Sequence, residues 1–333
     1  MNVDFDAVYY EPDALEYPLG QMLSQRYADL PWIPVESHNR IPELSAAENR
    51  EFLILKRHLI VGVRKTHAYS QNNKVSDFLV PYTSSGCRAM CLYCYLVCNY
   101  NKCSYLRVFV NREQMMERLL KKDAATPELC TFELGSNSDL VLENVVTNNL
   151  PWTIETFGRE GRGSITFPTK FDMVEPLLQL DHRGKTIFRM SVNPEEVIRR
   201  VELGTSPLPT RIQALNNMAK AGYPVGLLIA PVILLPGWKE LYGELIERLR
   251  VELSDQVKRE GFLEIILMTY SFIHNAINSD AFPGLVPLLD REKMTGRGRG
   301  KYCYRTEYRK EAETFFRTML EDKLPTMKLL YIS

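Results

Sequence analysis

The residues with the clearest chemical potential are cysteines, and five of the seven lie in one segment, "YTSSGCRAMCLYCYLVCNYNKC", at residues 82–103. Three of them, Cys87, Cys91 and Cys94, have the spacing C-x3-C-x2-C. A structural zinc ion needs four ligands, so a further cysteine of the segment would have to join these three. A [4Fe–4S] cluster takes four thiolates, or takes three and leaves one iron open to a small molecule. The polar residues around the thiols are not typical of a protein core, which favours ligands over buried, unligated cysteines.

The number of cysteines and the net charge indicate where this chemistry takes place. A disulfide framework spreads an even set of cysteines along a short secreted chain, so we expect reduced thiols and a cytoplasmic location. The N-terminal "MNVDFDAVYYEPD" is acidic and lacks the pattern of a secretory signal. The longest apolar run, Val225–Leu235, is about half as long as a membrane crossing requires, so we expect no membrane association. The formal net charge is zero, so any nucleic-acid binding must come from a local patch.

The elements that must position the thiols alternate between strands and helices after residue 77. About six such repeats predict parallel βαβ units and an α/β fold, a partial (β/α)6 barrel of the TIM type, with a doubly wound sheet as the alternative. We expect residues 1–76 to form an N-terminal α/β extension and residues 77–333 to form the barrel. The main strands are predicted at Cys130–Gly135, Lys185–Asn193 and Phe262–Phe272, and Gly163–Asp172 is predicted as a strand followed by a loop.

Two helices are predicted from start and stop signals in the sequence. A cap signal at Ser45, with acids in the first turn, predicts a helix over Leu44–Lys65. Proline at the first position and acids in the first turn predict a second helix over Pro194–Leu203.

Several polar segments follow predicted strands and so fall at the rim where barrel enzymes carry their functional residues. They are the cysteine segment, "TK" with Lys170, "SVN" with Ser191, and "AP" with Ala230. These independent placements favour the barrel over the doubly wound sheet. They also predict that the listed side chains meet at one site.

The cysteine spacing just after the first barrel strand is typical of radical S-adenosylmethionine enzymes. Within that group, "YTSSGCRAMCLYCYL", with Tyr93 and Tyr95 between and after the thiols, resembles the spore photoproduct lyase family. The resemblance covers most of the chain from about Asp77. It includes the stretches "TFELGSNSD", "ITFPTKFD", "FRMSVNPEEV", "GTSPLPTRIQALNNMAKAGYPVGLLIAPV" and "GRGKYCYRTEYRKEAETFFRTML".

The resemblance implies a DNA repair lyase that reverts 5-thyminyl-5,6-dihydrothymine, the spore photoproduct, to two thymines through a 5′-deoxyadenosyl radical. It implies a [4Fe–4S] cluster on Cys87, Cys91 and Cys94, with S-adenosylmethionine bound to the open iron. Family members return the hydrogen through a cysteine and tyrosines, which here include Tyr93 and Tyr95. By motif match, the residues that contact S-adenosylmethionine are Ser138, Lys170, Ser191 and Ala230.

The chain departs from the family pattern at the hydrogen donor. Where the family carries a donor cysteine before a Ser-Asp pair, this sequence reads "FELGSNSD", with Ser136 at that position. A serine O–H bond is much stronger than a thiol S–H bond, so a serine does not quench a thymine radical at a useful rate. We therefore expect another donor, for which the candidates are Cys98, Cys103, Cys130 and Tyr95. The alternatives are a related lesion or stereoisomer, or a paralogue with a different substrate.

The C-terminal stretch "KMTGRGRGKYCYRTEYRK", at residues 293–310, has seven basic residues and one acid. This composition predicts a basic β-hairpin that holds DNA phosphates and wedges the duplex open, so that the lesion leaves the stack. The residues expected to contact DNA are Arg297, Arg299, Lys301, Tyr302, Tyr304 and Arg305.

The predicted partners are DNA with a thymine lesion and a one-electron reductant such as flavodoxin or ferredoxin, and we expect a monomer. If the protein is not an enzyme, the alternative is a DNA-binding protein with an iron–sulfur cluster or a zinc ion. That protein would have a metal site that does not respond to S-adenosylmethionine.

Overall fold

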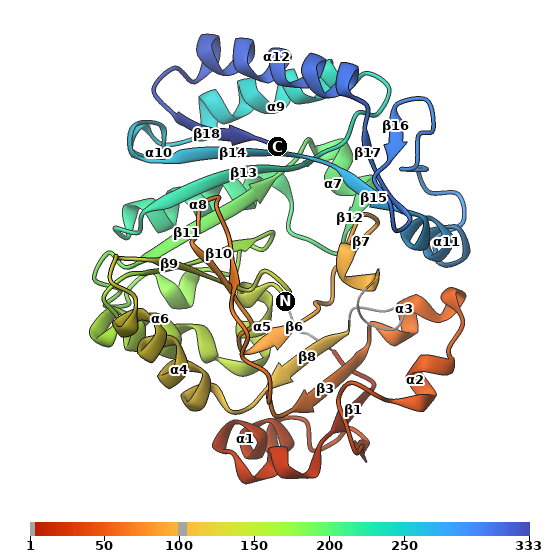
Figure 1. Cartoon of the computed structure of the whole chain (residues 1–333), viewed down its shortest axis with the longest axis vertical. Coiled ribbons are helices and arrows are strands. Elements are labelled where there is room, and N and C mark those ends of the chain that lie inside the picture. Colours follow the sequence, from red (N-terminus) through yellow and green to blue (C-terminus); the bar gives the residue numbers. More distant parts are fainter. Residues whose placement is uncertain (1–3, 99–104) are drawn as a thin grey trace. The chain divides into compact units, whose positions relative to one another are not determined.

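The computed structural model of the chain describes residues 4–98 and 105–333 (Figure 1). It divides into two compact units, each of which is described by itself. Unit 1 comprises residues 1–88, 96–169 and 173–187, and unit 2 comprises residues 89–95, 170–172 and 188–333. The predicted division into 1–76 and 77–333 does not coincide with these units and stays a prediction.

Unit 1 combines short strands with six α-helices in its described residues. The strands are β1 (Ala7–Tyr10), β2 (Trp32–Pro34), β3 (His58–Gly62), β4 (Ser70–Gln71), β5 (Phe78–Val80), β6 (Ser84–Ser85), β8 (Leu106–Phe109), β9 (Thr131–Leu134) and β10 (Ser164–Thr169). The helices are α1 (Pro18–Arg26), α2 (Pro42–Ala46), α3 (Phe52–Leu55), α4 (Arg112–Ala125), α5 (Leu140–Thr147) and α6 (Asn149–Glu160), with 3-10 turns η1 (Pro12–Glu16), η2 (Asn49–Glu51) and η4 (Glu175–Leu177).

The strands of unit 1 form two groups. One sheet has the order β2-β1-β3-β8-β6, in which only β6 pairs antiparallel. The other group runs β10-β9-β5-β4, with β4 antiparallel at its edge. The predicted single helix over Leu44–Lys65 is wrong, because its second half is the buried strand β3. The run "HLIVGV" is rich in β-branched side chains, which favour a strand over a helix.

Unit 2 contains the remaining strands and helices. Its strands are β7 (Met90–Cys91), β11 (Thr186–Val192), β12 (Glu202–Leu203), β13 (Val225–Val232), β14 (Phe262–Leu267), β15 (Thr269–Ser271), β16 (Met294–Gly296), β17 (Lys301–Tyr304) and β18 (Lys328–Ile332). Its helices are α7 (Glu195–Val201), α8 (Leu208–Lys220), α9 (Trp238–Glu252), α10 (Asp255–Glu260), α11 (Phe272–Ala281) and α12 (Thr306–Lys323). The 3-10 turn η3 (Tyr95–Cys98) and the first two residues of β11 extend into unit 1.

The parallel sheet confirms the predicted barrel class. In unit 2 the strands run β11-β13-β14-β18, all parallel. Helices α9 and α12 pack together in unit 2, with Tyr242 edge-on to Phe316 at 5.4 Å between ring centroids (Figure 1).

The predicted C-terminal hairpin is confirmed as the antiparallel pair β16 and β17. Strand β15 pairs with β17 on its other side, so the hairpin belongs to a three-stranded sheet of order β15-β17-β16. Left-handed backbone at Gly298, Arg299 and Gly300 forms the turn. Among the described residues, no helix is both long and apolar enough to cross a membrane.

Candidate active site

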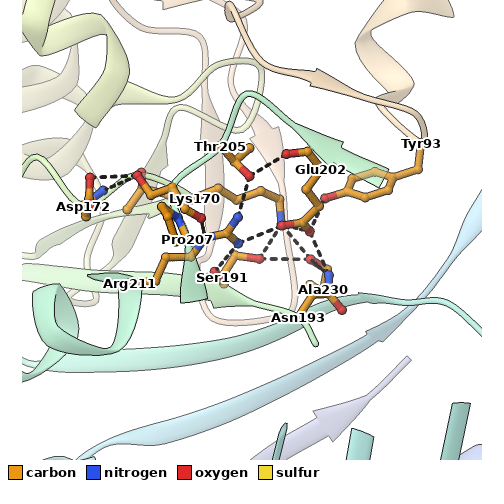
Figure 2. Close-up of polar contacts among 12 residues, drawn as sticks. Tyr93, Lys170, Asp172, Ser191, Asn193, Glu202, Thr205, Pro207, Arg211 and Ala230 are labelled. Carbon is orange, nitrogen blue, oxygen red and sulfur yellow. Dashed lines mark hydrogen bonds and ion pairs between the residues drawn. The ribbon is translucent and has the colours of Figure 1, made fainter. Parts of the chain in front are cut away.

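In unit 2, Lys170 lies among three acceptors, two of them at the ends of the neighbouring strands β11 and β13 (Figure 2). Its Nζ donates to Ser191 Oγ at 2.5 Å and to the Ala230 carbonyl at 2.7 Å, and it lies 3.1 Å from Glu202 Oε1. Ser191 Oγ also donates to the Ala230 carbonyl, at 2.9 Å. The structure therefore brings together three of the four residues that the sequence predicts for cofactor binding, at the carboxyl ends of β11 and β13.

Glu202 is a buried carboxylate that joins the charges of this site. Besides Lys170, it accepts from Arg211 Nη1 at 2.7 Å, from the Tyr93 hydroxyl at 2.5 Å and from Asn193 Nδ2 at 2.8 Å. Burial by itself would raise the pKa of Glu202, but Lys170, Arg211 and the hydrogen bonds outweigh it and lower the pKa to about 2. The side chain is therefore ionised, and one anion faces two cations.

Arg211 is completely buried, and its guanidinium is held from several sides. Its Nε donates to the Ser206 carbonyl at 2.7 Å, Nη1 to the Ser191 carbonyl at 3.0 Å and Nη2 to Thr205 Oγ1 at 2.6 Å. A buried guanidinium needs this number of acceptors, since each unpaired donor would be costly. Arg211 thus fixes the loop between β12 and α8 under the site.

The backbone explains why Glu202 reaches the cysteine segment. Strand β12 pairs antiparallel with β7, in a register that sets Glu202 opposite Cys91. The Leu92 amide donates to the Val201 carbonyl at 2.9 Å, and the Cys94 amide donates to the Cys91 carbonyl at 3.0 Å. These bonds shape the Cys91–Cys94 turn, which places Tyr93 within reach of Glu202.

The two predicted relay tyrosines have different surroundings. The Tyr93 hydroxyl donates to Glu202, and Lys170 Nζ lies 5.6 Å from the centroid of the Tyr93 ring. Burial, with the negative charges of Cys91 and Glu202, raises the pKa of Tyr93, so the phenol keeps its proton. Tyr95 is 52% exposed. Their role in hydrogen transfer stays a prediction.

In unit 1, the loop after β9 carries Ser136 and Ser138. Gly86 donates its amide to the Asn137 carbonyl at 2.6 Å and forms a β-bridge with Ser138, so this loop lies beside the residue that precedes Cys87. Ser138 Oγ is buried and has no hydrogen-bond partner within unit 1 as described. Such an orphaned hydroxyl fits a ligand contact.

The three predicted ligand cysteines are divided between the units. Cys87 belongs to unit 1, where Lys56 Nζ donates to its carbonyl at 2.6 Å, whereas Cys91 and Cys94 belong to unit 2. All three are partly buried. Across residues 4–98 and 105–333, no group of three or more His, Cys, Asp or Glu side chains is gathered at metal-binding range. The ligand prediction therefore rests on the type and spacing of the donors.

The structure argues against one of the candidate hydrogen donors. Cys130 is buried at the amino end of β9, whereas Ser136 follows the carboxyl end of the same strand. At about 3.3 Å per residue, these positions are roughly 20 Å apart, too far for one to replace the other. The side chain of Cys98, and the whole of Cys103, lie outside the described residues.

The predicted DNA-contacting residues fall into two groups. Arg297, Arg299, Lys301 and Arg305 are exposed and Tyr302 is partly exposed, as a DNA contact requires. Tyr304 is buried, and its hydroxyl accepts the Leu234 amide at 2.9 Å. The prediction that Tyr304 contacts DNA is therefore corrected, because its side chain is enclosed within unit 2. Its hydrogen bond instead anchors the hairpin.

The family model for spore photoproduct lyase matches residues 4–333. This chain belongs to the spore photoproduct lyase family. It is 34% identical to the spore photoproduct lyase of Bacillus subtilis over 336 residues, which cover 98% of this chain and 97% of the relative. It is 33% identical to that of a Geobacillus species, with 98% of each chain covered.

Solved structures of the family agree with the fold. A spore photoproduct lyase complexed with dinucleoside spore photoproduct has a TM-score of 0.92 and 31% identity, with each chain fully covered. A double mutant of a spore photoproduct lyase, with bound AdoMet and dinucleoside spore photoproduct, has a TM-score of 0.91 and 31% identity over 99% of each chain.

The sequence reasoning missed Glu202, Arg211 and Asn193. Glu202 was placed inside the predicted helix Pro194–Leu203, but that helix ends at Val201 and Glu202 starts β12. An acid between two apolar residues, Val201 and Leu203, is the signal that could have indicated a buried carboxylate.

A Glu202→Gln substitution keeps the volume but leaves Lys170 and Arg211 without their anion. We expect the free energy of unfolding of the metal-free protein to fall by about 3–5 kcal/mol at pH 7, because a buried pair is broken. Because the pKa of Glu202 is lowered from 4.5 to about 2, its stabilisation is complete above pH 4.5 and is lost as the pH falls toward 2. The difference between wild type and variant therefore shrinks over that window.

Urea unfolding at several pH values measures this difference. Glu196→Gln is the matched control, since Glu196 pairs with Arg199 and Arg200 at the surface and its loss should change stability little. Equal stability of the Glu202 and Glu196 variants at pH 7 would contradict the assigned role.

Proposed function

We propose that this chain is a radical S-adenosylmethionine lyase that reverts the spore photoproduct in DNA to two thymines. The proposal rests on full-length membership of the family and on relatives of the same length with that activity in their names. The single observation in this chain that supports it best is the convergence of Lys170, Ser191 and Ala230 at one point.

The residues of this chain fit the cofactors. Cys87, Cys91 and Cys94 offer three thiolates, the donors that iron–sulfur clusters take. The orphaned Ser138 Oγ and the clustered polar groups around Lys170 offer contacts for S-adenosylmethionine. A relative binds AdoMet together with the dinucleoside lesion. When bound, the cluster and S-adenosylmethionine supply a 5′-deoxyadenosyl radical by one-electron reduction, which starts cleavage of the lesion.

The protein contributes binding and orientation around that chemistry. The Lys170 ammonium suits the carboxylate of S-adenosylmethionine, and the Ala230 carbonyl suits its amino group. The ion pair with Glu202 fixes the position of the Lys170 ammonium independently of the ligand. Such preorganisation reduces the entropy lost on binding.

We propose that the hydrogen donor differs from the family's cysteine, because the motif match puts Ser136 at that position. We propose Cys98, which follows Tyr95 by three residues and ends η3. Tyr93 and Tyr95 then relay a hydrogen atom between the donor thiol and the cofactor, which regenerates S-adenosylmethionine. Cys130 is excluded by its place at the other end of β9.

The DNA partner is proposed to bind at the basic hairpin. Arg297, Arg299 and Lys301 are exposed on its turn and Arg305 at its base, in a chain whose net charge is zero. Exposed cations of this kind neutralise phosphates, and a hairpin can enter a distorted duplex. The physiological reductant is proposed to be a flavodoxin or ferredoxin, and the enzyme a cytoplasmic monomer.

Anaerobically reconstituted protein should cleave S-adenosylmethionine to 5′-deoxyadenosine and release thymine from oligonucleotides that contain the spore photoproduct. Both stereoisomers of the lesion are assayed by chromatography, with undamaged oligonucleotide as the control. Cleavage of the cofactor without thymine release from either isomer would indicate a paralogue with another substrate. An intact cluster that neither yields 5′-deoxyadenosine nor changes its paramagnetic resonance signal would indicate a non-catalytic protein.

The donor proposal predicts that Cys98→Ala consumes more S-adenosylmethionine per thymine released, because the thymine radical is then quenched by other routes. Introducing Ser136→Cys into that variant should restore the wild-type ratio, since the thiol returns to the family's position. Cys303→Ala, at a buried position on β17, is the matched control. A Cys98→Ala variant with the wild-type ratio would remove Cys98 as donor.

A further inference from the structure

Helix α11 contacts both the hairpin and the cysteine turn, and all of these residues belong to unit 2. Its amino end follows β15, the strand that pairs with β17 of the hairpin. The Phe272 amide donates to the Gly300 carbonyl at 2.9 Å, within the hairpin turn. The start of the helix is therefore fixed to the part of the hairpin that carries the exposed cations.

The first and second turns of α11 hold the backbone of the cysteine turn. His274 Nε2 donates to the Cys94 carbonyl at 2.5 Å, and Asn278 Nδ2 donates to the Leu92 carbonyl at 2.6 Å. Both contacts reach the main chain between the second and third predicted ligands.

The orientation of His274 and Asn278 is itself fixed. Ser271 Oγ lies 2.8 Å from His274 Nδ1, and the imidazole stacks on Tyr270 with centroids 5.2 Å apart. The Tyr270 hydroxyl accepts from Asn278 Nδ2 at 2.7 Å. Since Tyr270 and Ser271 are residues of β15, the hairpin sheet and the cysteine turn share one hydrogen-bonded network.

The first turn of α11 also exposes two large apolar side chains. Phe272 is 54% exposed and Ile273 is 49% exposed, next to the turn with Arg297 and Arg299. Apolar side chains flanked by cations are typical of surfaces that stack on or wedge between bases while the cations hold phosphates. The neighbouring positive charge favours DNA as the ligand of this surface.

We propose that α11 couples DNA binding to the cluster site, with Phe272 and Ile273 in contact with bases and His274 and Asn278 as positioning residues for the Cys91–Cys94 turn. The proposal rests on the proposed function, because it takes the thiols as cluster ligands and the hairpin as a DNA contact. Coupling is reciprocal: if DNA binding favours the turn geometry that holds the cluster, cluster binding strengthens DNA binding by the same factor.

The test compares DNA affinity before and after cluster loading. Fluorescence anisotropy with a labelled duplex that contains the spore photoproduct gives Kd for the metal-free and the reconstituted protein at one salt concentration. We expect loading to tighten binding at least about fivefold in the wild type. Iron and sulfide analysis confirms equal loading, so the readout does not depend on turnover.

Substitutions on α11 show which residues carry the effect of cluster loading on DNA affinity. In His274→Ala/Asn278→Ala, the affinity ratio between loaded and metal-free protein should fall to about one, while the metal-free affinity stays at the wild-type value. Asn278→Ala alone, at a partly exposed position, repeats the test if the double variant does not fold. Ser279→Ala, an exposed neighbour on the same helix, is the control that keeps the ratio.

Phe272→Ala should weaken binding in both forms about tenfold, because base stacking on an aromatic ring is lost. Val251→Ala, which removes an exposed apolar side chain on α9, should have no effect.

A ratio of one in the wild type, or an unchanged ratio in the His274 and Asn278 variants, overturns the coupling. Phe272→Ala with wild-type affinity overturns the base contact. These results leave the proposed function standing if the protein still binds DNA and cleaves S-adenosylmethionine. Wild-type protein that binds neither cluster nor DNA contradicts the proposed function together with the inference.

Discussion

One buried carboxylate, that of Glu202, determines how the site in unit 2 is built. It compensates two cations, Lys170 and Arg211, that would otherwise be buried without an anion. Its Oε1 also accepts from Tyr93 and Asn193. Because an unpaired buried charge costs several kcal/mol, each of these side chains is confined to a narrow range of positions. The strand ends that carry them are confined as well.

This constraint fixes the side chains around Lys170. Lys170 is aimed by Glu202, Ser191 and the Ala230 carbonyl. Tyr93 is held by Oε1 of the same carboxylate, the oxygen that also faces Lys170, and lies on the turn between two predicted cluster ligands. A single anion therefore links the proposed cofactor contacts to the proposed hydrogen relay.

The sequence was sufficient to predict the rim of the partial barrel. Parallel strands end at one edge, so Lys170, Ser191 and Ala230 were expected to meet from their places after predicted strands. Glu202 could not be found this way, because its two-residue strand β12 pairs with β7, which is far away in the sequence. The cap signal that precedes β3 led to the prediction of a helix. In the folded chain the run of β-branched side chains outweighs that signal and forms a strand. Tyr304 is a similar case. The basic composition of its segment predicted an exposed side chain, but the fold buries it.

The central claim is that the Lys170 site binds S-adenosylmethionine, and calorimetric titration of this ligand into the cluster-loaded protein tests it most directly. We predict that Lys170→Ala weakens binding at least about tenfold at unchanged iron content, because the ammonium that meets the ligand's carboxylate is lost. Lys121→Ala, an exposed lysine on α4, should bind as the wild type does. Wild-type affinity in the Lys170→Ala protein would contradict the account.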